Sequence, residues 1–142
     1  MKIKAILFGL LVVLLSSCNS NRLTEKVINT YSNRQPAKVY FYDQQGVWVL
    51  EKDYYENGAL MMEGPVADDL RNGDWTSYFL DGKVQSTGVY KNGVRVGPSK
   101  VYHENGQLWM DGRYHNDRKC GEWVFYDEQG YEIERKNFGP CE

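Results

Sequence analysis

The sequence predicts an all-β protein, in which stacked antiparallel β-hairpins form an open, twisted sheet or solenoid with a 24-residue repeat. Three observations predict this class. Aromatic and glycine residues recur in fixed columns, dipeptides typical of β-turns separate the runs between them, and helical periodicity is absent. Frequent glycines also disfavour long helices.

The repeat is defined by columns whose members lie 24 residues apart. A fixed period of this kind indicates units that cannot bury their apolar faces alone and therefore stack on one another. Three columns consist of structural glycines. They are Gly58, Gly82, Gly106 and Gly130; Gly64, Gly88 and Gly112; and Gly73, Gly97 and Gly121. A fourth column holds Tyr54, Tyr78, Tyr102 and Tyr126.

Each unit is expected to contain two strands and two turns. Asn57-Gly58 suits a tight hairpin turn, because glycine adopts positive φ freely and asparagine tolerates it. A strand such as ALMMEGPV follows, then a second polar turn such as KNGVRVG, and then a short aromatic strand such as PSKVYH. These elements fill one repeat with strands of ordinary length.

The mid-strand glycines predict close packing with aromatic rings. Leu60, Met62 and Gly64 share one face of a strand by alternation, and a glycine there weakens the strand unless another group must come close. Trp75 and Trp123 share a column, with Ser99 between them, and are the expected rings. The alternative is that the glycines only permit strong twist.

The tyrosine column suggests a binding surface. Tyr78, Tyr102 and Tyr126 are out of phase with the tryptophans, so alternation predicts that they face the opposite way unless a bulge intervenes. An exposed tyrosine ladder would bind an extended peptide, a glycan or a partner sheet, whereas a rolled sheet would bury it. The binding candidates are Tyr78, Tyr102, Tyr126, Trp75, Trp109 and Trp123.

Written as YxENGxLxxxGxYxNGxxxGxWxxY, the columns resemble the MORN repeat, in the variant form of bacterial YwqK-type proteins. The resemblance covers residues 54–126 well, with YDQQG at 42–46 as a shortened start and Lys136 in the glycine column of an atypical last unit. It implies a scaffold for interaction or membrane association without catalysis of its own. Because the bacterial variants are often labelled as antitoxins, it also implies a toxin as an alternative partner.

Residues 1–17 resemble a bacterial lipoprotein signal peptide. Lys2 and Lys4 precede an apolar run from Ala5 to Leu15, which is too short for a transmembrane helix. The residues before Cys18 resemble a lipobox, which implies that Cys18 is acylated and anchors an exported protein in the membrane. The alternative is an ordinary secretory signal. Asn19, in place of Asp, favours the outer membrane where the source has one.

The remaining chain divides into a tether and one repeat domain. Residues 18–38 are polar and are expected to form the lipidated cysteine and its tether, with one helical turn near Leu23 to Ile28. The repeat domain is expected at 39–142. Cys120 and Cys141 either form a disulfide that pins the C-terminal tail or stay as two thiols, and their spacing disfavours redox or zinc chemistry.

Charge and composition limit the classes of function that we expect. The formal net charge is −2, and it falls to −4 without Lys2 and Lys4, so a nucleic-acid partner is not expected. His103 and His115 occupy ordinary repeat positions, and no catalytic motif, metal site or cofactor site is recognisable. We therefore expect a non-enzymatic, lipid-anchored scaffold for an unknown protein partner at the cell envelope. The alternatives are an antitoxin or immunity protein, a structural envelope protein and a glycan-binding module.

Overall fold

A computed structural model of the chain describes residues 22–142. The signal peptide predicted for 1–17, Cys18 and Asn19 lie outside the described residues. All regular secondary structure within the described range is β-strand, which confirms the predicted fold class.

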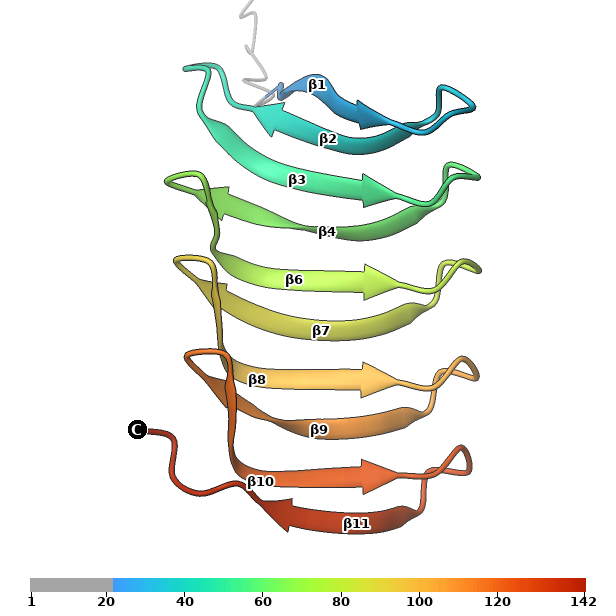
Figure 1. The fold of residues 1–142 in the computed structure, drawn as a ribbon, viewed down its shortest axis with the longest axis vertical. Coiled ribbons are helices and arrows are strands. Elements are labelled where there is room, and N and C mark those ends of the chain that lie inside the picture. The colour runs from blue at the N-terminus through green and yellow to red at the C-terminus, as the bar shows by residue number, and fades with distance from the viewer. Residues whose placement is uncertain (1–21) are drawn as a thin grey trace, which may run out of the picture.

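The strands form one open antiparallel sheet in which neighbours follow the order of the chain (Figure 1). The order is β1-β2-β3-β4-β6-β7-β8-β9-β10-β11, and the short β5 pairs with β4 off this path. The strands are β1 Thr24–Thr30, β2 Pro36–Tyr42, β3 Trp48–Tyr54, β4 Leu60–Ala67, β5 Leu70–Arg71, β6 Gly73–Tyr78, β7 Val84–Lys91, β8 Val94–Tyr102, β9 Leu108–His115, β10 Arg118–Tyr126 and β11 Glu132–Asn137. The sheet is a single layer with β1 and β11 at its two ends.

One long edge of the sheet, on the right in Figure 1, is formed by strand ends and carries the turns that contain Gly58 and its column partners. We call this column the asparagine–glycine column. In the turn between β3 and β4, the Gly58 amide donates to the Tyr55 carbonyl oxygen and the Tyr55 amide donates to the Ala59 carbonyl oxygen, both at 2.8 Å. Gly58 has φ +85°, a backbone conformation that favours glycine. The side-chain oxygen of Asn57 accepts a hydrogen bond from the Ala59 amide. The same pair of backbone bonds recurs in the turns at 31–35, 79–83, 103–107 and 127–131.

On the opposite edge, the turns that follow β4, β7 and β9 are shorter than the sequence predicted. Only Asn92 and Gly93 separate β7 from β8, and both have positive φ, as a two-residue hairpin turn requires. The predicted turn KNGVRVG was therefore too long, and β8 begins at Val94. Gly97 and Gly121 have positive φ inside β8 and β10, beside breaks in strand register, so they act as bulge residues rather than turn residues.

The tether predicted for 18–38 was wrong over residues 24–38. β1 and β2 form a further hairpin, and Thr24–Thr30 is extended where a helical turn was expected. Arg34 takes φ +68° at the position of the column glycine, so this unit lacks the residue that marks the others. The YDQQG turn joins β2 to β3 on the opposite edge, so it does not begin the turn column (Figure 1).

Two tryptophans build the core against the mid-strand glycines. A Cβ atom added at Gly64 would lie less than 3.0 Å from the Trp75 ring, and one at Gly112 would lie equally close to the Trp123 ring. Trp75 is 3 % exposed and Trp123 is 1 % exposed. Their indole N–H groups donate to the carbonyl oxygens of Pro65 at 3.0 Å and of Arg113 at 3.1 Å. Close packing, rather than twist alone, thus accounts for these two glycines.

Candidate binding surface

Trp75 and Trp123 were binding candidates, but their burial makes them core residues. A cation covers each ring: the guanidinium carbon of Arg71 lies 4.1 Å from the Trp75 ring centroid, and Lys119 Nζ lies 4.2 Å from that of Trp123. Burial, followed by the charges of nearby cations, lowers the pKa of Lys119. Neither indole is left for a partner, so the prediction of a binding role for both was wrong.

The tyrosine column is neither an exposed ladder nor a buried one. Tyr78, Tyr102 and Tyr126 are each half-buried, and a break in strand register lies beside each of them. The Tyr78 hydroxyl donates to Glu63 Oε1 at 2.9 Å, while Trp75 faces Gly64 on the other side of the sheet. Burial, and then Glu63, raise the pKa of Tyr78.

The column one residue after the tyrosine column, at positions 31, 55, 79 and 103, links successive turns by hydrogen bonds. The Tyr55 hydroxyl donates to the Tyr78 carbonyl oxygen at 2.8 Å, and Tyr31 donates to Tyr54 in the same way at 2.7 Å. Phe79 stands one unit after Tyr55, and His103 takes the place of the tyrosine two units after it. The His103 Nε2 lies 3.0 Å from the Tyr126 carbonyl oxygen. His103 therefore has a structural bond, and His115 lines a separate hollow beside Cys120.

A buried ionic cluster replaces the tryptophan core in the first units. Glu51, which stands 24 residues before Trp75, is 4 % exposed, and Asp53 is 6 % exposed. Lys38 Nζ lies 2.6 Å from Glu51 Oε1 and 3.0 Å from Asp53 Oδ1, and Arg71 reaches Glu51 at 3.1 Å. Burial opposes the charge of Lys38, but both carboxylates together outweigh it and raise its pKa. This cluster was not predicted from the sequence, although the position of Glu51 in the tryptophan column could have indicated it.

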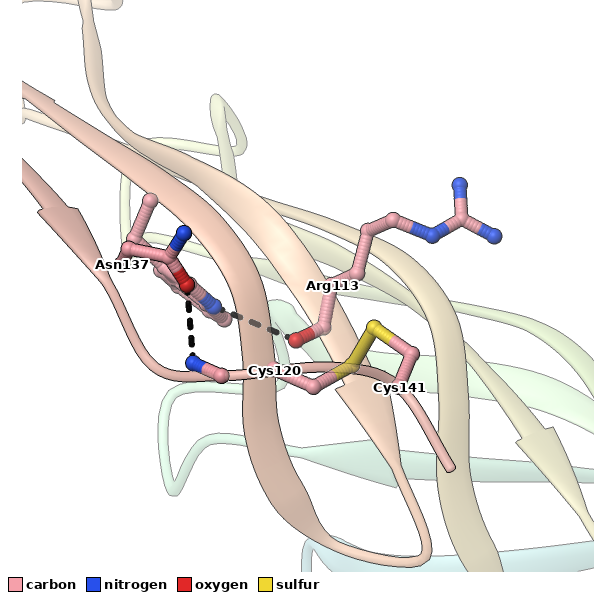
Figure 2. The surroundings of a disulfide bond; sticks show 6 residues. Arg113, Cys120, Asn137 and Cys141 are labelled. Atoms are coloured by element: carbon pink, nitrogen blue, oxygen red, sulfur yellow. Dashed lines mark hydrogen bonds between the residues drawn. A yellow bond between two sulfur atoms is a disulfide. The ribbon is translucent and has the colours of Figure 1, made fainter.

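Cys120 and Cys141 form a disulfide that holds the tail across the last hairpin (Figure 2). Their Cα atoms are 5.0 Å apart. The Phe138 amide donates to the Gly121 carbonyl oxygen at 2.9 Å, and Asn137 Oδ1 accepts the Gly139 amide at 2.8 Å. The tail thus continues the line of β11 along β10.

Trp109 is the binding candidate that the structure leaves accessible. Its side chain on β9 is 42 % exposed, and its ring centroid lies 5.7 Å from that of His103. It lines a hollow of about 470 Å³ at the edge that carries the longer turns. The other residues of this hollow, which we call the Trp109 hollow, are Phe79, Tyr102, His103, Glu104, Asn105 and Glu128.

Two acidic residues of the Trp109 hollow were not among the predicted site residues. Glu104 and Glu128 are 24 residues apart, so the repeat itself places them in neighbouring turns. The Asn105 side-chain amide donates to the Glu128 carbonyl oxygen at 2.8 Å and holds these turns together. The period could therefore have identified this pair beside Trp109.

The described chain offers no group of three His, Cys, Asp or Glu side chains that could hold a metal ion. Within residues 22–142, no helix has the length and apolar character needed to cross a membrane.

In a comparison with known families, the model of the MORN repeat variant matches three segments of the chain, residues 49–68, 71–92 and 95–116. Each copy spans a strand, a turn of the asparagine–glycine column and the next strand. The sheet continues on both sides of the matched segments, through β1–β2 and through β10–β11. No curated protein is significantly similar to the chain.

Proposed function

We propose that the protein is a non-catalytic scaffold that holds a protein partner at the cell envelope through its repeat sheet. The observation that carries this proposal is the architecture: MORN repeat variants build an open, single-layer sheet with an accessible aromatic hollow on its turn edge. A repeat sheet of this kind offers an extended surface on which a partner can bind.

The contacts of the titratable side chains favour a structural role for these groups over a catalytic one. His103 bonds the Tyr126 carbonyl oxygen, and Lys38 and Arg71 compensate the buried carboxylates of Glu51 and Asp53. These contacts give the groups roles within the sheet, which supports a scaffold function.

The partner is tested by photocrosslinking in cells of the source. A benzophenone amino acid replaces Gln107, beside the Trp109 hollow, in the full chain. The matched control carries it at Gln45, an exposed glutamine in the turn on the opposite edge. We expect one protein to crosslink at 107 and not at 45, and the purified pair to bind with fixed stoichiometry. A chain that crosslinks to no protein at either position contradicts the scaffold.

The membrane anchor is the second part of the proposal. Acylation of Cys18 would fix the chain to a bilayer at the β1 end of the sheet, since residue 18 precedes β1 by only a few residues. In cells given an alkynyl fatty acid, the wild type and Cys141→Ser should take up the label and sediment with membranes. Cys18→Ser should do neither. Equal labelling of Cys18→Ser would exclude acylation at this residue.

A further inference from the structure

We infer that the Trp109 hollow is a receptor for a positively charged side chain, a lysine or an arginine, presented by the protein partner. This inference rests on the proposed scaffold function and adds the chemistry by which the partner is recognised.

The indole of Trp109 is free for a ligand, unlike those of the other tryptophans. Trp48 donates its N–H to the Leu50 carbonyl oxygen at 3.0 Å, and Trp75 and Trp123 bond carbonyl oxygens within the core. The Trp109 N–H bonds no group in residues 22–142, and 42 % of its side chain is exposed. The sheet therefore gains little from this ring beyond what a smaller apolar side chain would supply.

The chain itself shows how its aromatic rings bind cations. Arg71 covers Trp75 at 4.1 Å, Lys119 covers Trp123 at 4.2 Å and Arg95 covers Tyr114 at 4.2 Å. Such contacts arise because the negative face of the ring attracts a positive charge, most strongly for tryptophan. In the part of the chain that the structure describes, no cation covers Trp109.

The charge of the hollow selects a cation over other ligands. Glu104 and Glu128 line it, and neither carboxylate forms an ion pair with any residue in the range 22–142. Lys83 lies at the turn before that of Glu104, but its Nζ bonds the Glu104 backbone carbonyl at 3.0 Å and the Asp81 carboxylate at 2.7 Å. An anionic group would be repelled here, and an apolar group would desolvate two carboxylates without compensation.

The hollow is formed before any ligand arrives. His103 is fixed by the Tyr126 carbonyl oxygen at 3.0 Å, and Asn105 is fixed by that of Glu128 at 2.8 Å. Both bonds join turns that follow one another in the sheet, so the aromatic residues and the two glutamates of the hollow keep their spacing. A preformed site avoids the entropy cost of ordering its own side chains on binding.

The test measures binding of model peptides to the uniformly ¹⁵N-labelled full chain in non-ionic detergent micelles. The probe is acetyl-Gly-Arg-Gly-Arg-Gly-amide, and the neutral comparison replaces both arginines with citrulline. The readout is the indole N–H signal of Trp109 in ¹H–¹⁵N spectra, assigned from Trp109→Phe. The arginine peptide should shift this signal saturably and less at high salt, and the citrulline peptide should not shift it.

Charge-matched variants separate the hollow from the overall charge. Glu104→Gln with Glu128→Gln should weaken binding of the arginine peptide about fivefold to tenfold, as expected for loss of two exposed carboxylates around a cation–π contact. Asp74→Asn with Glu134→Gln removes the same charge from exposed residues outside the hollow and should leave the affinity unchanged. The other three indole signals report folding, and the single glutamine variants replace the double one where these signals move.

Three outcomes overturn the inference: no shift of the Trp109 signal with the arginine peptide, equal binding of the citrulline peptide, or equal affinity in both double variants. These outcomes are distinct from failure of the scaffold. A partner that crosslinks at residue 107 and binds the Glu104→Gln, Glu128→Gln chain with the affinity of the wild type refutes the cation receptor alone. The absence of any crosslinked partner refutes the scaffold, whatever the peptides do.

Discussion

The Trp123 ring occupies the space that a side chain on Gly112 would need, since a Cβ atom there would lie less than 3.0 Å from the indole. The ring is 1 % exposed and also donates its N–H to the Arg113 carbonyl oxygen. One glycine thus sets the depth at which the largest fully buried side chain lies.

Gly112→Ala should therefore destabilise the protein, because the added methyl group would force the Trp123 ring out of its position. Overpacking of this kind costs about 1–3 kcal/mol of unfolding free energy. Gly88→Ala is the control in the same column, since only Ser99 Oγ, at 3.7 Å, comes within 4 Å of its added Cβ atom. Urea denaturation followed by tryptophan fluorescence measures both variants. Equal losses would show that backbone conformation, rather than the ring, requires these glycines.

Ser99→Trp should stabilise the sheet by supplying the ring that is missing between Trp75 and Trp123 in this column. The space over Gly88 is open, and the Val89 carbonyl lies ten residues before position 99, as Pro65 and Arg113 do for the two existing tryptophans. Filling such a gap contributes about 0.5–2 kcal/mol.

The matched control for Ser99→Trp is the double variant that adds Gly88→Ala. If the new ring lies over Gly88, the methyl group should cancel the gain, and the double-mutant cycle should show strong coupling between the two positions. Additive effects would place the new ring elsewhere.

Much of the fold could be predicted because its physical requirements appear in the sequence. The turn at Gly58 needs positive φ, and Trp75 needs a neighbour without a side chain, so both requirements leave glycine at a fixed spacing. The first hairpin was missed because Arg34 adopts the same left-handed conformation without glycine. The adjacent Asn33 helps this turn by accepting the Gln35 amide at 2.9 Å.

The candidate site was harder to predict, because column membership does not reveal exposure. Trp75, Trp109 and Trp123 were all binding candidates, although Trp75 and Trp123 were also expected to pack on glycines. The structure shows that Trp109 is the accessible one of these three. Glu104 and Glu128 come from neighbouring turns, so their 24-residue spacing was the one sequence signal that they lie together beside Trp109.

Loss of the Cys120–Cys141 disulfide should loosen the C-terminal end of the sheet. The bond closes a sequence separation of 21 residues, for which the chain-entropy model gives about 3 kcal/mol. Reduction should lower the urea midpoint and speed amide exchange in β11 before the rest of the sheet responds. Cys120→Ala with Cys141→Ala should reproduce this state and no longer respond to reductant. Unchanged exchange in β11 would mean that strand pairing alone holds the tail.

The ion pair between Lys52 and Glu63 should make the unfolding free energy depend on pH. Lys52 Nζ lies 2.9 Å from Glu63 Oε2, and this hydrogen bond, opposed by burial and aided by Tyr78, lowers the pKa of Glu63 below its ordinary 4.5. A carboxyl group with a depressed folded-state pKa contributes stability above its unfolded-state pKa and loses it as pH falls through the folded-state value. The unfolding free energy of the wild type should therefore fall between about pH 5 and pH 3.

Glu63→Gln should lower the unfolding free energy near neutral pH and flatten its decline in acid, because the neutral amide keeps no proton-linked contact. Glu134→Gln is the control, since this exposed carboxylate on β11 forms no ion pair with residues 22–142. Urea denaturation at a series of pH values measures the slope for each variant. If Glu63→Gln retains the slope of the wild type, the acid sensitivity does not arise from the contact between Lys52 and Glu63.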